Sequence, residues 1–447
     1  MKITWVLFFL FLTLYAQSGL SLTEAIAKVK QNNQEINIAK FDEQIKKLEH
    51  QMAVGQSYGS LDLTQLALRS DDALSVFGFK LQSREATFAD FGFKQLNMSN
   101  PNYDAQPSDL NYPKDRNLFQ TTISYSIPIY TGGKLEQYGK ITEALQYLST
   151  LDRQALTLQK IYEVKKNFYT LSLMKTYLYN LDIIAKNITH LEKTTQAMLD
   201  EGYAKKVDLL EVQARLADVE RQILQTKANQ SLVYSYLSFL VDEPVTQITG
   251  DYETAPNNML NSEWFLSENL DIKKAEQGVA ISKMKIALQE SAFLPQISAF
   301  AQYGSSDNKL MNDFEKHDAY TAGLQIKWNL FNGGSDKAGY EKAHVENLKA
   351  EQELQLAQKR MALHVKQLQT QMQSHDYEIT SLKKEVEVAH LIYDNYAGRY
   401  AQKLVSINDV MLKQSEELKM VLKLKEVQNE RNDIIFELEK IAAKESK

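Results

Sequence analysis

The chain has 447 residues and a formal net charge of −6, with 44% hydrophobic and 24% charged residues. This balance is typical of a folded protein, and the acidic net charge gives no reason to expect nucleic acid as a partner. Cysteine is absent, which excludes disulfides, thiolate metal sites, cysteine nucleophiles and lipid attachment through an N-terminal Cys.

The first residues have the pattern of an export signal. Lys2 precedes an apolar run from Ile3 to Tyr15 that only two threonines interrupt. The run is much shorter than the ~20 residues of a spanning helix, and small residues follow it. We therefore expect a signal peptide over residues 1–18, cleaved after Ala16 or after Ser18. The alternative is a buried apolar helix at the start of the chain.

A pattern that occurs twice, 201 residues apart, organises the rest of the chain. Each copy has an alternating strand, a Gly-Gly pair, and then more than fifty residues with neither Gly nor Pro. The pairs are Gly132-Gly133 and Gly333-Gly334, and Asp208 and Asp409 keep the same offset. The sequence therefore predicts an internal duplication, with a first repeat over 19–240, an equatorial linker over 241–267 and a second repeat with a C-terminal helix over 268–447.

Two segments without Gly or Pro predict unusually long helices. Apolar residues between 135 and 199 recur mostly at steps of three and four, as in a coiled-coil seam. Such a helix would be roughly 97 Å long, so each long helix needs two stacked shorter ones as partners. The shorter helices are expected at 21–54, 208–240, 268–292 and 408–442, with 208–240 stacked on 268–292 and 408–442 stacked on 21–54.

Four candidate strands precede and separate the long helices. Those at 119–129 and 320–330 alternate clearly between apolar and polar residues, whereas those at 57–69 and 295–304 are weaker. Within 57–69 the apolar positions change phase, which suggests a bulge or a misplaced boundary. About ten residues with one apolar face suit a tilted membrane strand, although a half-buried strand of a soluble sheet alternates in the same way.

The segment between the first two strands, 71–117, is rich in aromatic residues and ends with three prolines. Because the long loops of outer-membrane barrels face outside, we expect it there. Four strands cannot close a barrel without unpaired edges, so several copies are required. Eight strands from a dimer and twelve from a trimer both remain possible.

Several motifs resemble those of the TolC-type outer-membrane efflux proteins, also called outer membrane factors. The order of helix, strand, loop, strand, Gly-Gly, long helix, turn and returning helix, repeated once, is similar to theirs over about 21–440. The matching motifs are Ser21 to Ile26, Asn33 to Ile36, Phe293 to Ser298, Leu330 to Gly334, and Arg399 to Asp409.

This resemblance implies an α+β membrane protein and a homotrimer. Its four strands per chain would form a shared twelve-stranded β-barrel, continued by a long coiled-coil α-helical barrel across the periplasm. It would be a passive exit duct of a tripartite efflux or type I secretion system, in contact with outer-membrane lipid. Its helical tip would dock to a periplasmic adaptor, the membrane fusion protein, and through it to an inner-membrane pump.

The resemblance also implies roles for residues at the tip. Tyr400 matches a gating tyrosine, and Asp208 and Asp409 match carboxylates of the gate and the entrance. Val405 and Leu412 depart from the family pattern at a basic partner and a second carboxylate, and Lys403 replaces a glycine. The remaining expected residues are Lys205, Lys206 and Arg399 for the gate, Gly202, Tyr203, Val405 and Ser406 for adaptor docking, and the two Gly-Gly pairs for the joints between barrel and tunnel.

Enzyme functions find no support in the motifs. The seven histidines lack zinc-binding spacing, and Gly132-Gly133-Lys134 lacks the other residues of a phosphate loop. We therefore expect no enzyme, no cofactor, and no catalytic or metal-binding residues. A periplasmic coiled-coil adaptor or scaffold without a membrane barrel is the alternative function. The substrate, whether drugs, metal ions or secreted proteins, stays open.

Overall fold

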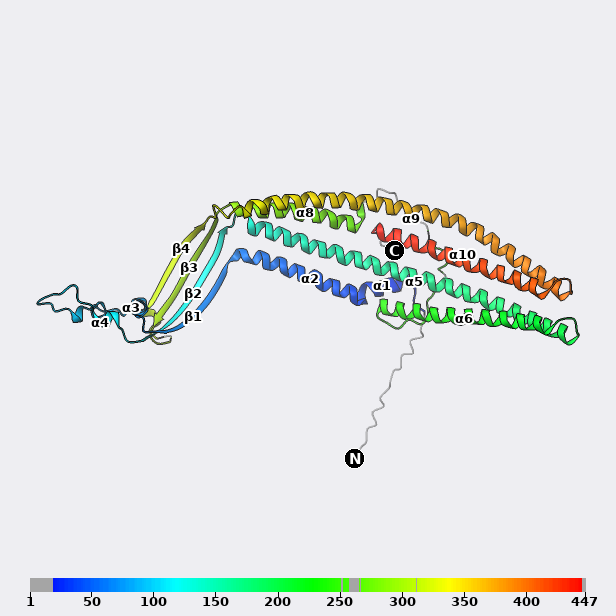
Figure 1. Ribbon diagram of the computed structural model, residues 1–447, viewed down its shortest axis with the longest axis horizontal. Coiled ribbons are helices and arrows are strands. Elements are labelled where there is room, and N and C mark those ends of the chain that lie inside the picture. Colours follow the sequence, from blue (N-terminus) through cyan, green and yellow to red (C-terminus); the bar gives the residue numbers. More distant parts are fainter. Residues whose placement is uncertain (1–18, 251, 257–264, 266, 311, 444–447) are drawn as a thin grey trace, which may run out of the picture. The chain divides into compact units, whose positions relative to one another are not determined.

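The computed structural model describes residues 19–250, 252–256, 265, 267–310 and 312–443. The expected signal peptide and part of the expected linker lie outside the described residues. The strands are β1 (Ser60–Ser70), β2 (Arg116–Tyr130), β3 (Gln296–Asp307) and β4 (Asp318–Lys327). The helices, shown in Figure 1, are α1 (Leu22–Asn32), α2 (Gln34–Gly55), α3 (Ala73–Gln82), α4 (Ser108–Asn111), α5 (Lys134–Asp200), α6 (Lys206–Val241), α8 (Leu270–Glu290), α9 (Ser335–Ala401) and α10 (Ile407–Ile441).

The predicted duplication is confirmed by the helices. α5 and α9 have 67 residues each, and they begin 201 residues apart, at Lys134 and Ser335. The helices that follow, α6 and α10, begin at Lys206 and Ile407, with the same offset. The observed α5 ends within one residue of the predicted 135–199 on each side. The agreement is close because the Gly-Gly pair and Gly202 mark the two ends of the helix.

The chain divides into two compact units, which we describe separately. The first comprises residues 1–44, 148–277 and 352–447, and the second comprises 45–147 and 278–351. Helices α2, α5, α8 and α9 each contribute residues to both units.

Each long helix pairs with two shorter ones as expected, but the expected stacks are wrong. The end of α6 meets the start of α2, and the end of α10 meets the start of α8, so each returning helix shares its long partner with the helix that precedes the strands of its own repeat. In the first unit, α5 is bound to α2 by Arg153 Nε, which donates to Glu43 at 2.6 Å, and to α6 by Tyr236, which donates to Glu163 at 2.8 Å. There too, His390 of α9 lies 2.8 Å from Glu417 of α10. In the second unit, Ser282 of α8 donates to Asn347 of α9 at 2.8 Å. Hydrogen bonds and ion pairs thus run beside the apolar seams.

The main core of the first unit lies where these helices meet. Val164, Phe168 and Leu171 of α5, which belong to the predicted seam, are at most 1% exposed. They pack in one cluster with buried residues of α6, α9 and α10. The burial confirms that the three-and-four periodicity marks the contact face of the helix. No helix in the described part of the chain is long and apolar enough to cross a membrane.

The predicted single helix at 21–54 is wrong in one respect, because it breaks at Asn33. The backbone there has φ −56° and ψ 123°, outside the helical region. The Asn33 side chain is buried, accepts from the Ile36 N–H at 3.2 Å and donates to the Leu240 carbonyl at 2.9 Å. It therefore caps the start of α2 and the end of α6 together.

Asn269 plays the same part in the second repeat. Its buried side chain accepts from the N–H groups of Asp271 and Ile272 at 3.0 Å and donates to the carbonyl of Ile441 at 3.0 Å. Leu240 and Ile441, the two carbonyl acceptors, are again 201 residues apart. One buried amide per repeat thus satisfies the free backbone groups at the two helix ends that meet there.

The second unit contains one antiparallel sheet with the order β1-β2-β3-β4, which Figure 1 shows as four neighbouring arrows. Its register places Leu63, Ile123, Tyr303 and Tyr320 in one row across the strands. Because directly paired residues share a face of the sheet, the row belongs to one apolar face. Its side chains are between 46% and 82% exposed. The predicted two-faced strands are therefore confirmed, and their apolar faces align.

Two details of the strands differ from the expectation. β1 pairs with β2 without a register shift, so the suspected bulge in the first strand is wrong; a shift occurs instead in β2, between Pro128 and Tyr130. Leu68 lies on the opposite face from Leu63 and pairs with Leu118, which is buried next to β1. The fourth strand ends at Lys327 rather than at 330.

The segment between β1 and β2 is folded, with α3 in contact with both β2 and β3. Val76 and Phe79 of α3 are buried. The guanidinium of Arg116, at the start of β2, binds the side chains of Glu85 and Ser83. The end of the sheet beside this segment is therefore covered.

We predict that Asn269→Ala lowers the apparent melting temperature of the detergent-solubilised full chain. The substitution leaves the Ile441 carbonyl and two N–H groups of α8 without their partner, at a cost of about 1–3 kcal/mol. Circular dichroism at 222 nm during heating measures it. Asn229→Ala, at an exposed position of α6, is the matched control with an expected change within about 0.5 kcal/mol. Equal losses in both variants would contradict the role of Asn269.

Candidate functional site

The sequence-predicted tip residues gather at two helical turns of the first unit. The first turn joins α5 to α6 and the second joins α9 to α10. Beneath them, four helices share an apolar cluster. Its buried members are Leu181, Ile184, Ile188, Leu191, Val212, Val219, Tyr393, Tyr400, Ile407, Val410 and Leu418.

Gly202 makes the first turn possible. Its φ of +79° is in the left-handed region, where glycine has no Cβ to clash. The N–H of Tyr203 then donates to the Met198 carbonyl at 2.7 Å, closing the end of α5. Asp208 accepts from the backbone N–H of Lys205 at 2.7 Å, so that its carboxylate caps the start of α6.

The second turn repeats this geometry with different residues. Lys403 takes the place of Gly202 and has a φ of +65°, which costs a residue with a side chain about 1–2 kcal/mol. Ser406 and Asp409 form a reciprocal cap: the Asp409 carboxylate accepts from the Ser406 N–H at 3.1 Å, and Ser406 Oγ accepts from the Asp409 N–H at 3.3 Å. The hydrogen bonds of Ser406 hold the pKa of Asp409 below its usual value, so this carboxylate is charged at neutral pH.

Tyr400 connects the two repeats. It is 6% exposed, and its hydroxyl lies 3.1 Å from Oγ1 of the fully buried Thr195 on α5. Because Thr195 already donates to the Leu191 carbonyl at 2.9 Å, Tyr400 is the donor. Burial raises the pKa of the Tyr400 phenol, which keeps it protonated and able to donate. Sequence reasoning missed Thr195, since a threonine inside a helical seam carries no distinctive pattern.

The basic residues of the tip face tyrosines. Nζ of Lys403 lies 3.2 Å from the ring centre of Tyr203, and the Arg399 guanidinium lies 5.7 Å from that of Tyr396. Both are cation–π geometries. Within the described residues, Asp208 forms no ion pair with Lys205, Lys206 or Arg399. The role of Lys205, Lys206 and Arg399 in the gate stays a prediction.

The expected docking residues differ in accessibility. Tyr203 is 66% exposed and lines a shallow pocket with Met198 and Lys403. Val405 packs against the apolar cluster. The N–H and hydroxyl of Ser406 are both hydrogen-bonded to Asp409 in the cap of α10. A further contact that sequence reasoning missed joins α6 to α10, where Arg215 Nε donates to the buried Gln414 at 2.8 Å.

The two Gly-Gly pairs lie between β2 and α5 and between β4 and α9. All four glycines have positive φ: 65° at Gly132, 83° at Gly133, 58° at Gly333 and 83° at Gly334. Their surroundings differ. A Cβ at Gly132 would lie 2.8 Å from Leu294 Cβ and 2.9 Å from the Ser291 carbonyl oxygen, whereas none of the described atoms lies within 4 Å of one at Gly333.

Known proteins share this fold. Residues 263–441, which span the second repeat from before α8 to the end of α10, match the family model described as outer membrane efflux protein. The proteases secretion protein PrtF of Dickeya chrysanthemi is 22% identical over 325 residues, which cover 67% of this chain and 69% of that protein.

Two solved structures cover 94% of this chain. The outer-membrane channel OprN has a TM-score of 0.79 with 14% identity over 89% of its own length. The outer membrane protein VceC of Vibrio cholerae has a TM-score of 0.77 with 14% identity over 96% of its length. The resemblance of this chain to the TolC-type outer-membrane efflux proteins is thus confirmed. The family is described as an efflux protein, PrtF as a secretion protein and OprN as a channel, and none of these descriptions names an enzyme.

We predict that Gly132→Ala destabilises the protein more than Gly333→Ala. Both substitutions place a side chain at positive φ, which costs about 1–2 kcal/mol. Only the alanine at position 132 also comes too close to Leu294 and Ser291. Parallel thermal unfolding of the two solubilised variants measures the difference. A melting temperature that falls further for Gly333→Ala would show that the close approach of Leu294 and Ser291 is unimportant.

Proposed function

We propose that this chain is a subunit of a passive exit duct in the outer membrane, serving an efflux or a type I secretion system. One observation carries the proposal: a sheet with an exposed apolar face is joined twice, through Gly-Gly, to helices of 67 residues. The efflux family match and the similarity to a protease secretion protein support it. The duct extends from the outer membrane into the periplasm.

The sheet supports assembly from several copies. β1 and β4 are the edges of the described sheet, and lipid offers no hydrogen bonds to their unpaired backbone groups. Pairing β1 of one copy with β4 of the next satisfies both edges. A homotrimer, which the family resemblance implies, closes a barrel of twelve strands. The apolar row of Leu63 and Tyr320 then faces lipid, and the polar face with Thr122 and Gln302 lines the lumen.

The two helical turns are proposed as the periplasmic gate and docking surface. Tyr400 holds the repeats together, and Asp208 and Asp409 present carboxylates at the starts of α6 and α10. Lys205, Lys206, Arg399 and Lys403 would contact neighbouring copies. The docking surface for a periplasmic adaptor, linked to an inner-membrane pump, is made of Gly202, Tyr203, Val405 and Ser406. The four glycines at the strand ends are the proposed joints between barrel and tunnel.

The proposed organisation follows the repeats: 19–240, an equatorial linker over 241–267, and 268–447. In this proposal the protein catalyses no reaction and needs no cofactor for transport, because the pump supplies energy and selects the substrate. The competing function is that of a periplasmic adaptor or scaffold. An adaptor has one helical hairpin, whereas this chain has two, each joined to a pair of strands, which argues against that function.

We predict that the expressed chain is recovered in the outer-membrane fraction, as a band whose gel mobility changes on heating from that of an oligomer to that of a monomer. Barrels that are closed between copies resist detergent until heat breaks their strand pairing. Membrane fractionation with unheated and boiled samples measures this. Recovery in the soluble periplasm would overturn the duct and favour the adaptor.

We predict that Tyr400→Phe, Thr195→Val and Asp208→Ala each raise single-channel conductance or open probability in planar bilayers. Tyr400→Phe and Thr195→Val each remove the hydrogen bond between the repeats, which is worth about 0.5–1.5 kcal/mol and shifts a closed-to-open equilibrium about two- to tenfold. Asp208→Ala removes a carboxylate whose charge acts on Tyr400. Tyr377→Phe is the control, because this tyrosine of α9 is 80% exposed. Unchanged currents in both the Tyr400 and Asp208 variants would refute this gate.

A further inference from the structure

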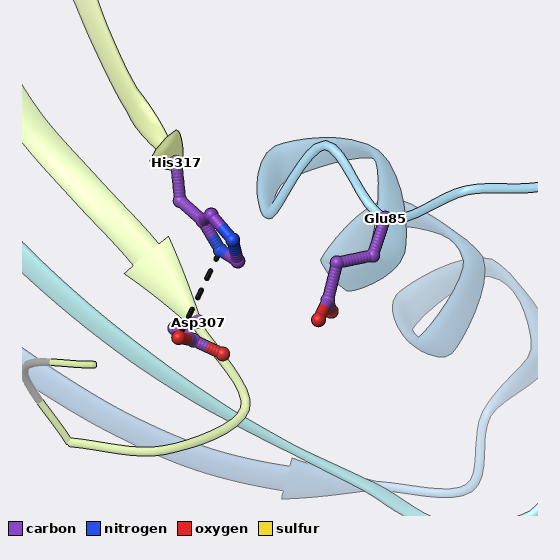
Figure 2. Close-up of side chains that lie close together, drawn as sticks. All are labelled: Glu85, Asp307 and His317. Carbon is purple, nitrogen blue, oxygen red and sulfur yellow. Dashed lines mark ion pairs between the residues drawn. The ribbon is translucent and has the colours of Figure 1, made fainter. Parts of the chain in front are cut away.

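Three chain segments of the second unit bring an imidazole and two carboxylates together. Glu85 follows α3, Asp307 is the last residue of β3, and His317 precedes β4. One potential ligand atom from each lies within 4.8 Å of the other two. Figure 2 shows the Glu85 and His317 side chains directed toward one another, with Asp307 beside the imidazole.

Both carboxylates are oriented by neighbouring donors. Asp307, with a side chain 5% exposed, accepts from the Asn308 N–H at 2.5 Å and from Asn312 Nδ2 at 3.0 Å. Glu85 Oε2 accepts from Ser83 Oγ at 2.9 Å and from the Arg116 guanidinium. Oε1 of Glu85 has no hydrogen bond among the described residues, so it stays available to a ligand. Such supporting bonds are what metal sites use to hold their ligands.

His317 is the unexplained member of this group. Its Nδ1 is buried and has no hydrogen-bond partner among the described residues. The distance from Nδ1 to Asp307 Oδ2 is 3.8 Å, too long for a hydrogen bond. A buried polar atom without a partner costs about 1–3 kcal/mol, so this nitrogen needs a partner that the described residues do not supply.

A metal ion fits the gap. Zinc binds histidine nitrogen and carboxylate oxygen at about 2.0–2.2 Å, so two of its ligands at a tetrahedral angle lie about 3.3 Å apart. The observed 3.8 Å between Nδ1 and Oδ2 therefore closes with a small movement. The Glu85 side chain is 35% exposed, so a rotation of this side chain can bring its carboxylate to the ion.

We propose that Glu85, Asp307 and His317 form a binding site for a divalent transition-metal cation, with Zn²⁺ as the ion that suits one nitrogen and two oxygens best. The ion ties the segment between β1 and β2 to the connection between β3 and β4. The Arg116 guanidinium offsets part of the negative charge and orients Glu85 toward the ion. This site goes beyond the proposed transport function and does not depend on it.

Zinc titration of the untagged, full-length, detergent-solubilised protein tests the proposal after treatment with a chelator. We expect about one zinc per chain, counted by mass spectrometry of the metal after desalting. His317→Ala and Asp307→Asn should each weaken zinc binding at least about tenfold. His190→Ala, which removes an exposed histidine of α5, should bind zinc as the unsubstituted chain does.

A second measurement separates a structural effect from a binding effect. Zinc should slow proteolysis within 71–117 in the unsubstituted chain and in His190→Ala, but not in His317→Ala, while circular dichroism shows that all three are folded. Two results would overturn the site. The unsubstituted chain could retain no zinc, which would mean that Arg116 alone balances the charge of the two carboxylates, or the His317→Ala variant could bind zinc as tightly as the unsubstituted chain.

Discussion

The structure depends on covering two apolar seams that each run along a helix of 67 residues. α6 and α10 have 36 and 35 residues, so neither can cover its long neighbour alone. A further helix is needed for each, and helix ends that meet along the seam leave free N–H and carbonyl groups. Asn33 and Asn269 satisfy these groups, and the break between α1 and α2 is a consequence.

Duplication supplies the scaffold, and the differences between the copies supply the functional features. The helix starts keep their offset of 201 residues, yet Gly202 in the first turn corresponds to Lys403 in the second. Lys403 accepts a left-handed backbone and lies on Tyr203. Tyr400 reaches Thr195 across the repeats. In the proposed gate, opening breaks contacts between the repeats, while the helices themselves keep their internal hydrogen bonds.

Some features could not be predicted, for identifiable physical reasons. Asn33 lies in a stretch without Gly or Pro whose helical periodicity continues on both sides, so the break is invisible locally. The phase change in the first strand suggested a bulge, but side chains simply alternate along a regular strand, so Leu68 faces away from Leu63 and is paired with the buried Leu118. The cap that the Asp208 carboxylate forms at the start of α6 gave no sign in the local charge pattern. Glu85 lies far along the chain from Asp307 and His317, so no spacing rule joins the three.

The sequence by itself determined the repeat, the long helices, the two-faced strands and the places of the turns. These follow from periodicity and from Gly and Pro, which act within a few residues through backbone sterics and the alternation of side chains. Only the tertiary structure decided which polar groups meet: Asn269 with Ile441, Tyr400 with Thr195, and His317 with Glu85. Such meetings depend on strand register and on the rotation of one helix against another, which residues hundreds of positions apart set together.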